Sequence, residues 1–367
     1  MKLKNYSISL PDYSIGDDVY GKIGDICSKA GNRIVCIGGK TAMSKARKLI
    51  ICALEGTELE IIDWIWYGGE ASWENVDVLE KCQAVKDADM IFGIGGGKAL
   101  DTAKVLAYKV GKPVFTFPTI ASNCAGTTAV SIMYNSDGSF KEPYFFPAPA
   151  KHCFINTRII AESPKKYLWA GIGDTYAKYF ESTMSSRGED LVHYHALGVT
   201  VSELCLTPLL KYGKKALEDF EKGVSSFELE QAVLSVVVTT GIASILLTAE
   251  HIIDYNTGLA HAVFYALTSY PHIEERHLHG EVVGFGVLIL LLVDGNDKMF
   301  KTMFDFNKSI GLPVCLADIE MSTDDLDKLV PAVCKMKDID HNPYKITENM
   351  VFDAFNRLEE YNKNNNF

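Results

Sequence analysis

Short apolar runs alternate with helix-like stretches through the first part of the chain, and this alternation limits the fold more than any other feature. The apolar runs cover residues 33–37, 60–64, 90–94 and 113–117. Apolar residues at helical spacing fill stretches between them, for example residues 42–53 and 76–88. Strands that alternate with helices in this way form a parallel sheet with helices on both faces. We therefore predict an α/β domain in this part of the chain.

Helical periodicity dominates the rest of the chain, because strand-like runs nearly disappear after Arg158. The candidate helices cover residues 174–185, 191–212, 231–251, 258–268, 282–293, 323–336 and 348–361. We place the boundary near Ser163 and Pro164, since proline is favoured in the first turn of a helix. A chain of 367 residues also exceeds the size at which one hydrophobic core stops growing. The sequence thus predicts an α/β domain over residues 1–160 and an all-helical domain over residues 161–367.

The charge balance disfavours polyanionic partners. The chain has 47 acidic and 36 basic residues, a formal net charge of -11, which repels nucleic acid and anionic membrane surfaces. One stretch, residues 231–249, carries no charge and approaches the length of a bilayer span. It contains Ser, Thr and Gly at six positions, so we predict a buried central helix. We expect neither nucleic acid nor a membrane as a partner.

The nine cysteines indicate a reducing compartment. They are scattered, odd in number and never spaced as a CxxC pair, which is typical of reduced thiols rather than of disulfides or a zinc knuckle. The opening residues contain lysines but no apolar run behind them, so they do not resemble a signal peptide. We expect a cytoplasmic protein.

Three consecutive glycines follow the strand predicted at residues 90–94 and open a helix. Gly95, Gly96 and Gly97 lack side chains, so backbone N–H groups can approach a pyrophosphate at the helix N-terminus. Lys98 is placed to add a positive charge. The spacing matches neither G-x-G-x-x-G nor a P-loop, and a tight turn without a ligand is about equally common. A second loop follows the next strand and offers hydroxyls at the same edge of the sheet, where ligands of α/β proteins bind, namely Thr116, Thr119 and Ser122.

Six motifs occur in the order that is found in one enzyme family. They read GGGKALDTAK, FPTIAS, SIMYNSDG, AGIGDTYAKYFE, AHAVFYALTSYP and HGEVVGFG. From about residue 15 to beyond residue 290, the chain resembles the glycerol dehydrogenase branch of the iron-containing alcohol dehydrogenase superfamily, which includes dehydroquinate synthase-like folds. The resemblance implies a dinucleotide-binding α/β domain, a helical domain that binds metal and substrate, and a metal in the cleft between them. It also implies a homo-oligomer.

The same resemblance implies one divalent metal, held by Asp174, His261 and His279, which are also the expected catalytic residues. Two imidazoles and one carboxylate leave a coordination position open, as in catalytic zinc or iron(II) sites. Some family members use a histidine four residues after the aspartate as a fourth ligand, and Lys178 stands there in this chain. This difference favours zinc over iron. Glu281 is expected either to orient a ligand or to be a solvated helix carboxylate.

The resemblance and the glycine turn together imply NAD or NADP as the cofactor. NAD-preferring relatives carry an acidic residue after the first strand, whereas this chain has Gly39 and Lys40. Lys40 either meets a 2′-phosphate or starts a helix in solvent, and we favour NADP over NAD. The expected cofactor contacts are Gly39, Lys40, Gly95, Gly96, Gly97, Lys98, Asp101, Thr116, Thr119, Ser122, Thr128, Val130 and Tyr134.

The residues that directly follow Ser122 differ from the corresponding loop of glycerol dehydrogenases. Asn123 and Cys124 are expected to contact the substrate, but glycerol dehydrogenases carry an aspartate where Cys124 stands. A thiol binds a polyol hydroxyl less well than a carboxylate does. The loop instead resembles that of bacterial hydroxycarboxylate dehydrogenases, which act on short 2-oxo acids. A nucleophilic role for Cys124 is the alternative, although no histidine motif accompanies it.

We therefore predict a metal-dependent, NAD(P)-linked oxidoreductase that interconverts a small alcohol or 2-hydroxy acid and its carbonyl form. A glycerol dehydrogenase acting on glycerol and dihydroxyacetone is the nearest alternative. A lyase similar to dehydroquinate synthase and a non-catalytic nucleotide-binding protein represent other classes. The expected partner is a small-molecule substrate. The proton-relay group stays open, because Phe264 replaces a histidine of several relatives and three substitutes are available, His272, His277 and Tyr134.

Overall fold

The computed structural model describes residues 5–365, which divide into two compact units. The first unit contains the chain up to Lys165 together with Asp219–Ile245, and the second contains Lys166–Glu218 and the chain from Leu246 onward. The first break follows Lys165, and the domain boundary at residue 160 stays a prediction. The units are not two continuous blocks, however, because the segment Asp219–Ile245 from the predicted helical domain belongs to the α/β unit.

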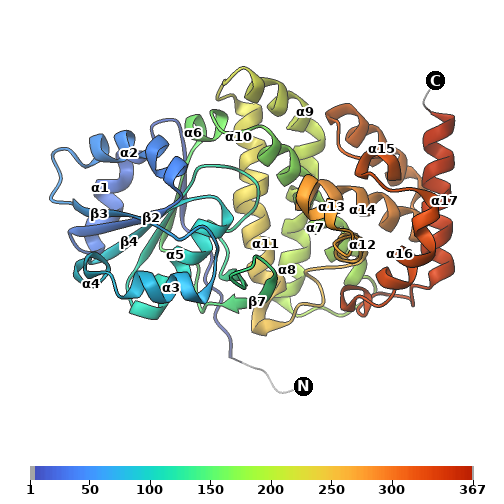
Figure 1. The fold of residues 1–367 in the computed structure, drawn as a ribbon, viewed down its shortest axis with the longest axis horizontal. Coiled ribbons are helices and arrows are strands. Elements are labelled where there is room, and N and C mark those ends of the chain that lie inside the picture. Colours follow the sequence, from blue (N-terminus) through green and yellow to red (C-terminus); the bar gives the residue numbers. More distant parts are fainter. Residues whose placement is uncertain (1–4, 366–367) are drawn as a thin grey trace. The chain divides into compact units, whose positions relative to one another are not determined.

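A six-stranded parallel sheet forms the centre of the first unit, in the order β1-β8-β5-β4-β2-β3 (Figure 1). Its strands are β1 (Tyr13–Gly16), β2 (Arg33–Gly38), β3 (Glu60–Trp66), β4 (Met90–Gly95), β5 (Val114–Pro118) and β8 (His152–Asn156). Four of them coincide with the four predicted apolar runs, so the predicted parallel α/β sheet is confirmed. The sequence analysis missed β1 and β8, which pair with each other, and a separate antiparallel hairpin of β6 (Val130–Tyr134) and β7 (Phe140–Phe145).

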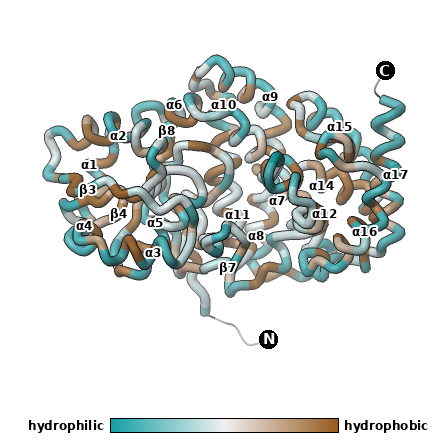
Figure 2. Tube along the Cα trace, viewed as in Figure 1, coloured by the Kyte–Doolittle hydropathy of each residue, from teal (hydrophilic) through white to brown (hydrophobic). Residues whose placement is uncertain are grey.

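Helices cover both faces of this sheet, namely α1 (Ile23–Cys27), α2 (Lys40–Leu54), α3 (Trp73–Glu80), α4 (Gln83–Asp87), α5 (Gly97–Val110) and α6 (Thr157–Ala161). On one face, α1, α2 and α6 pack on strand residues such as Ile34 and Phe92. On the other face, α3, α4 and α5 pack on the alternate residues Val35 and Ile91 of the same strands. This alternation follows from the two-residue period of a strand. In Figure 2 the region of β3 and β4 is accordingly rich in hydrophobic residues.

The second unit consists of helices joined by loops, and it has no strand among the residues that the structure describes. Its helices are α7 (Lys166–Ser185), α8 (His193–Ser202), α9 (Thr207–Glu221), α12 (Leu259–Leu267), α13 (Pro271–Arg276), α14 (His279–Val293), α15 (Asp297–Ile310), α16 (Leu326–Val333) and α17 (Glu348–Asn364). α14 is buried at every position from Gly280 to Leu292, and α7, α12, α15 and α17 pack around it. A helix that is apolar on all sides belongs in such a core. The predicted helical second part of the chain is confirmed.

The uncharged stretch at residues 231–249 forms most of one helix, which runs from Phe227 to Leu247. This helix consists of α10 (Phe227–Val233), a π-helical segment (Leu234–Thr239) and α11 (Thr240–Leu247). Among the described residues it is the one helix long and apolar enough to cross a bilayer, yet 72% of its most apolar window is buried inside the protein. Such burial is typical of a core helix, as predicted.

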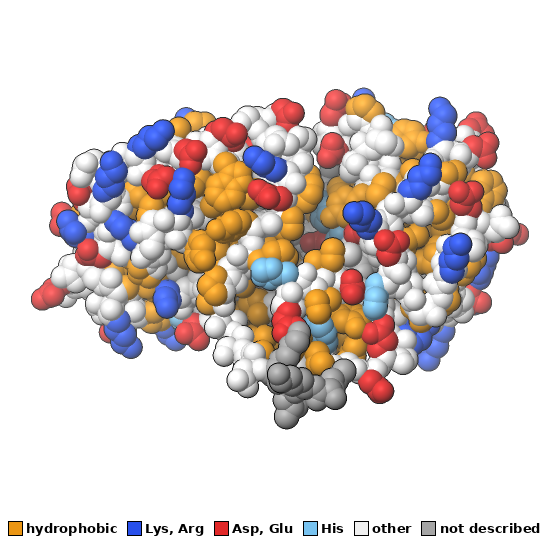
Figure 3. All heavy atoms as spheres, turned by 90° about the horizontal axis from the view of Figure 1, so that it is seen from below, with side chains coloured by type: hydrophobic (Ala, Val, Ile, Leu, Met, Phe, Trp, Pro, Cys, Tyr) orange, Lys and Arg blue, Asp and Glu red, His pale blue; other side chains and the backbone are white. Residues whose placement is uncertain are grey.

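Acidic and basic side chains are interspersed over the face of the molecule that Figure 3 shows. The two signs alternate over short distances on this face, and hydrophobic side chains are visible between them. This face therefore offers no extended basic surface of the kind that binds a polyanion.

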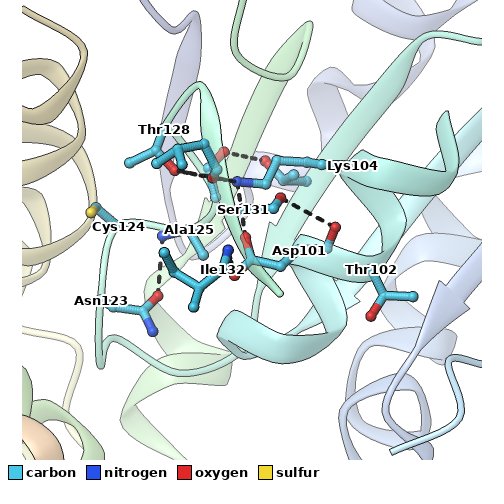
Figure 4. Close-up of polar contacts among 12 residues, drawn as sticks. Asp101, Thr102, Lys104, Asn123, Cys124, Ala125, Thr128, Ser131 and Ile132 are labelled. Atoms are coloured by element: carbon cyan, nitrogen blue, oxygen red, sulfur yellow. Dashed lines mark hydrogen bonds and ion pairs between the residues drawn. The ribbon is translucent and has the colours of Figure 1, made fainter. Parts of the chain in front are cut away.

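A buried ion pair on α5 holds the hairpin strand β6 through hydrogen bonds (Figure 4). Nζ of Lys104 lies 3.1 Å from Oδ1 of Asp101, and the two side chains are 2% and 9% exposed. Lys104 also donates to the carbonyl oxygen of Val130 at 2.6 Å and to the hydroxyl of Thr128 at 3.2 Å. Oδ2 of Asp101 accepts a hydrogen bond from the backbone N–H of Ile132 at 3.2 Å. Burial raises the pKa of Asp101, and the charge of Lys104 offsets only part of that effect.

We predict that Lys104→Met destabilises the protein strongly, because it leaves the carboxylate of Asp101 buried without a cation. Removing one partner of a buried ion pair costs about 3–5 kcal/mol, which corresponds to a fall in Tm of about 10 °C for a unit of this size. Thermal unfolding followed by circular dichroism measures the change. The control is the double variant Asp101→Asn, Lys104→Met, which should lose less stability than Lys104→Met alone. An unchanged Tm for Lys104→Met would contradict this account of the pair.

Candidate metal centre and cofactor turn

Three helices of the second unit, α7, α12 and α14, approach one another at glycines. A Cβ atom on Gly173 of α7 would lie 2.1 Å from the carbonyl oxygen of Gly280 on α14. A Cβ atom on Gly280 would lie 2.0 Å from the carbonyl oxygen of Ala170. α12 meets α14 in the same way, since a Cβ atom on Gly286 would lie 2.5 Å from the carbonyl oxygen of Ala260. No side chain fits at such distances, so these glycines set the spacing of the three helices.

The side chains of Asp174, His261 and His279 meet beside these contacts. Oδ1 of Asp174 lies 3.5 Å from Nε2 of His261 and 3.4 Å from Nε2 of His279. One ligand atom from each residue lies within 4.8 Å of the other two. The side chains of Asp174 and His261 are 21% and 11% exposed, whereas that of His279 is 44% exposed. The cluster is therefore largely enclosed and accessible at His279.

Asp174 lies in the middle of α7, where it cannot cap the helix. The candidate helix at residues 174–185 would place Asp174 at a helix start, where an N-cap carboxylate is the ordinary interpretation. α7 instead begins at Lys166 and continues through Gly171 and Gly173, both buried. Glycine in a helix interior costs about 1 kcal/mol relative to alanine, and here it permits the close approach of α14. A carboxylate in mid-helix has no unpaired backbone N–H to bind, so Asp174 stays available to the two imidazoles.

Glu181 holds the ring of His261 in place. It lies two helical turns after Asp174 on α7, so both carboxylates lie on one face of the helix. Its side chain is fully buried and accepts two hydrogen bonds from His261, one from the backbone N–H at 2.9 Å and one from ring Nδ1 at 2.7 Å. A carboxylate only accepts, so Nδ1 carries the proton and Nε2 faces Asp174. Local sequence patterns did not predict this role of Glu181, although it is the last residue of the motif AGIGDTYAKYFE.

The charges of the cluster perturb one another strongly. Burial alone would raise the pKa of Asp174, but hydrogen bonds and positive charge from His261 and His279 outweigh burial and hold that pKa below its usual range. Burial lowers the pKa of His261, but Glu181 and Asp174 outweigh it and raise that pKa to about 10. Without a metal, His261 therefore carries an extra proton at neutral pH, which a bound metal would displace.

This donor set fits a catalytic metal. Two imidazole nitrogens and one carboxylate oxygen suit zinc or iron(II) and leave coordination positions for water or substrate. A carboxylate on the far ring nitrogen, as Glu181 provides for His261, is the usual outer partner of a metal-binding histidine.

Phe264 and Lys178 border the cluster. The ring centroid of Phe264 lies 4.4 Å from that of His279 in an edge-to-face contact, so an apolar ring stands at the position where several relatives have a histidine. Lys178 lies one turn after Asp174 and is buried. Its Nζ donates to Oδ1 of Asn256 at 2.9 Å and also to the backbone carbonyl of that residue. An ammonium group only donates, so Lys178 cannot replace the fourth ligand of other family members.

Glu281 fixes the start of α14 and makes no hydrogen bond to His279 in the described structure. It accepts the backbone N–H of Leu278 at 2.9 Å and Nδ1 of His277 at 2.8 Å. The ring of His272, another candidate relay, lies 6.2 Å from that of Tyr270. These contacts do not single out a proton-relay group.

The glycine turn lies at the carboxyl end of β4 in the first unit. Gly95 has φ +149°, a conformation that favours glycine, and Gly96 and Gly97 open α5. The N–H of Gly39, which precedes α2, donates to the carbonyl oxygen of Ile94 at 3.2 Å. The turns after β2 and β4 therefore meet at one edge of the sheet, the edge at which α/β proteins bind ligands.

Both lysines expected at the cofactor have partners in the protein. Nζ of Lys98 lies 2.6 Å from Oε2 of Glu70 and 4.9 Å from the ring centroid of Tyr134. Nζ of Lys40 lies 4.5 Å from the ring centroid of Trp66. A phosphate at Lys98 would thus compete with the carboxylate of Glu70, whereas Lys40 faces an aromatic surface that leaves its charge uncompensated.

Three of the expected cofactor contacts use their side chains inside the protein. The hydroxyl of Thr116 donates to the carbonyl oxygen of Gly126 at 2.6 Å. The hydroxyl of Thr128 donates to the carbonyl oxygen of Val130 at 3.0 Å. Asp101 is committed to its buried ion pair. The observed role of these side chains is to hold the loops together, and their direct contact with a cofactor stays a prediction.

Thr119 and Asn123 lie against the glycine turn. The backbone N–H of Thr119 donates to the carbonyl oxygen of Gly95 at 3.1 Å. A Cβ atom on Gly97 would lie 2.6 Å from Nδ2 of Asn123, so the amide occupies the space that this glycine leaves. The structure thus brings the two loops named in the sequence analysis into contact.

The residues on either side of Asn123 are partly exposed, namely Ser122 and Cys124. Oδ1 of Asn123 accepts the backbone N–H of Ala125 at 3.1 Å, which closes a small turn. Figure 4 shows the side chains of Asn123 and Cys124 pointing away from the buried Lys104. Both expected substrate contacts are therefore accessible.

Known proteins with similar sequences include several dehydrogenases. The family model for iron-containing alcohol dehydrogenase matches residues 11–151. A glycerol dehydrogenase from Thermotoga maritima is 34% identical over 311 residues, which cover 81% of each chain. Hydroxycarboxylate dehydrogenase A from Escherichia coli is 28% identical over 337 residues, which cover 90% of each chain.

The fold agrees with these similarities. The crystal structure of glycerol dehydrogenase from Schizosaccharomyces pombe has a TM-score of 0.84 at 23% identity and covers 99% of this chain and 92% of that chain. The protein is accordingly a metal-dependent oxidoreductase that acts on CH–OH groups with NAD(P). The sequence identity over four-fifths of the chain and the family match to residues 11–151 place it in one group: the chain belongs to the iron-containing alcohol dehydrogenase family.

Proposed function

We propose that this protein interconverts a small 2-hydroxy acid and the corresponding 2-oxo acid, with NADP(H) as hydride carrier and one zinc ion at Asp174, His261 and His279. The observation that carries the metal site is the convergence of three ligand atoms within 4.8 Å. When bound, a divalent metal supplies Lewis-acid polarisation of a carbonyl oxygen.

The residues around the metal site supply orientation and charge. Glu181 keeps the proton of His261 on Nδ1, which leaves Nε2 directed at the metal position. Ionised Asp174 balances part of the charge of a divalent ion. Phe264 packs against His279 and excludes water from one side of that ring. These contacts hold the ligands before a metal arrives, which reduces the reorganisation needed for binding.

One absent negative charge and one buried positive charge support an anionic substrate. Cys124 replaces a carboxylate that would repel an acid, and the buried Lys178 adds a cation on the face of α7 that carries Asp174. The observed hydrogen-bond partner of Lys178 is the neutral Asn256, and none of the described ion pairs includes Lys178. The hydroxycarboxylate dehydrogenase relative agrees with this proposal. Oxidation of glycerol is the second candidate, because a relative at 34% identity is a glycerol dehydrogenase.

Lys40 supports NADP over NAD. It begins α2 directly after Gly39, where an acidic residue would bind the 2′-hydroxyl of NAD. Its charge and the N-terminus of α2 would both attract a 2′-phosphate. Its contact with Trp66 holds the side chain at this edge without neutralising it.

Two further proposals concern the cellular compartment and the oligomeric state of the enzyme. No disulfide joins the nine cysteines, all of which lie within residues 5–365, and this supports a reducing, cytoplasmic compartment. A homo-oligomer is proposed from the family resemblance alone.

A substrate and cofactor panel tests the function. NADPH and NADH absorbance is followed with 2-oxobutanoate, 2-oxoglutarate, dihydroxyacetone and simple aldehydes, with added zinc or iron and after chelation. We expect the highest kcat/KM with a 2-oxo acid and NADPH, loss of turnover on chelation, and recovery with zinc. A preference for dihydroxyacetone or for NADH would refute the substrate or the cofactor proposal, and turnover that survives chelation would refute the metal proposal.

We predict that Glu181→Gln weakens zinc binding, because the ring of His261 loses its charged partner. Loss of such an outer contact typically lowers metal affinity by about 10–100-fold. Competition with a chelating dye measures the affinity without reference to activity. The matched control is Glu281→Gln, a nearby buried carboxylate that bonds Leu278 and His277 instead of a ligand. Equal losses in the two variants would show that Glu181 has no special role.

We predict that Lys178→Met raises the KM of a 2-oxo acid more than that of neutral dihydroxyacetone. A hydrogen bond to a charged group contributes enough binding free energy to change KM about tenfold or more. Neutral dihydroxyacetone has no carboxylate, so it loses no such bond. Steady-state kinetics with both substrates measure the ratio, in which general damage to the protein cancels. Lys178→Arg keeps the charge and should keep the ratio. A ratio that is unchanged in Lys178→Met would remove Lys178 from substrate recognition.

A further inference from the structure

One buried threonine attaches the loop at residues 123–128 to the apolar helix. Thr127 is fully buried, and its hydroxyl has two acceptors within reach, the backbone carbonyl oxygen of Val237 and, at 3.1 Å, that of Cys124. Val237 belongs to the π-helical segment Leu234–Thr239. Such segments are rare and occur frequently at functional sites. The loop that carries Asn123 and Cys124 is therefore joined to a helix that is distant in sequence.

The helix is shaped to receive this hydroxyl. A Cβ atom on Gly241 would lie 2.0 Å from Oγ1 of Thr127 and 3.0 Å from its Cβ. The hydroxyl of Thr240 donates at 2.9 Å to the carbonyl oxygen of Ser235, five residues earlier, which matches the wide spacing of a π-turn. The carbonyl of Val237 and the bare backbone of Gly241 thus form a recess, which we call the helix recess, for one small polar side chain.

Thr127 also closes the turn that presents Cys124. The carbonyl oxygen of Cys124 accepts the backbone N–H of Thr127 at 2.9 Å and that of Thr128 at 3.1 Å. The neighbouring residue Gly126 is held from the other side by the hydroxyl of Thr116 in β5. A displacement of Thr127 would therefore move the turn with it, because the turn hydrogen bonds couple the two positions directly.

We propose that Thr127, held in the helix recess, is a positioning residue for Asn123 and Cys124 at the substrate. The link from loop position to catalysis rests on the proposed function, whereas the link from the recess to the loop rests on geometry alone. A shift of groups that bind the ground state and the transition state equally raises KM and leaves kcat nearly unchanged.

Three variants of the recess and one control test this proposal. Thr127→Val removes the hydroxyl and keeps the shape. Gly241→Ala favours the helix intrinsically but pushes the hydroxyl out of the recess. Thr127→Ser keeps the hydroxyl. Thr183→Val is the matched control, because the hydroxyl of Thr183 bonds within its own helix, to the carbonyl oxygens of Tyr179 and Phe180.

Steady-state kinetics with the best 2-oxo acid give the first readout. We expect Thr127→Val and Gly241→Ala to raise KM about tenfold while kcat stays within about threefold, because substrate contacts shift and the metal ligands do not. Thr127→Ser should restore KM. Thr183→Val should lower Tm without changing KM, as a merely structural threonine would. A KM that is unchanged in both Thr127→Val and Gly241→Ala would overturn the proposal.

Alkylation of Cys124 gives a second readout that needs no substrate. Iodoacetamide labelling is followed by peptide mass spectrometry, with the exposed Cys52 as the internal reference. We expect the labelling rate of Cys124 relative to Cys52 to rise about threefold or more in Thr127→Val and Gly241→Ala, since the loop opens more often. Unchanged labelling in both variants would overturn the proposal. A wild-type enzyme that is inactive on every carbonyl would refute the proposed function instead and leave this readout intact.

Discussion

The close approach of three helices at glycines is the constraint on which the candidate metal centre depends. Gly173 and Gly280 let α7 and α14 touch through their backbones, and Gly286 does the same for α14 and α12. Helices that carried side chains at these positions would be pushed apart, and carboxylate and imidazole atoms would no longer converge. The glycines lower the helix propensity of α7 and α14, but burial of α14 on all sides compensates for that loss.

Around this packing, buried charge is arranged in one connected set. Asp174 lies between two imidazoles, and Glu181 accepts a hydrogen bond from Nδ1 of His261. Each charge in the set is matched by an opposite neighbour, so burial does not neutralise the carboxylates. A divalent metal that displaces one proton from His261 would add one unit of positive charge beside the two carboxylates. The centre is thus prepared electrostatically for a cation.

In the first unit, buried contacts hold loops at one edge of the sheet. The buried pair of Asp101 and Lys104 fixes the hairpin to α5, the space over Gly97 receives Asn123, and the helix recess receives Thr127. Every one of these contacts joins the loops to a rigid helix. Binding groups that are carried on loops gain precision in this way, because the scaffold rather than the loop limits their motion.

The sequence by itself determined the elements with local signals: the parallel strands, the helical second part, the glycine turn and, through ordered motifs, the triad of Asp174, His261 and His279. The strands, helices and turn follow from periodicity and spacing along the chain, whereas the triad was expected from the family resemblance. Only the tertiary structure decided that Glu181 rather than Glu281 bonds a histidine of the triad, that Asp101 is buried with Lys104, and that Asp219–Ile245 joins the α/β unit. Such contacts link residues far apart in sequence, and their geometry depends on how helices pack, which no local pattern encodes.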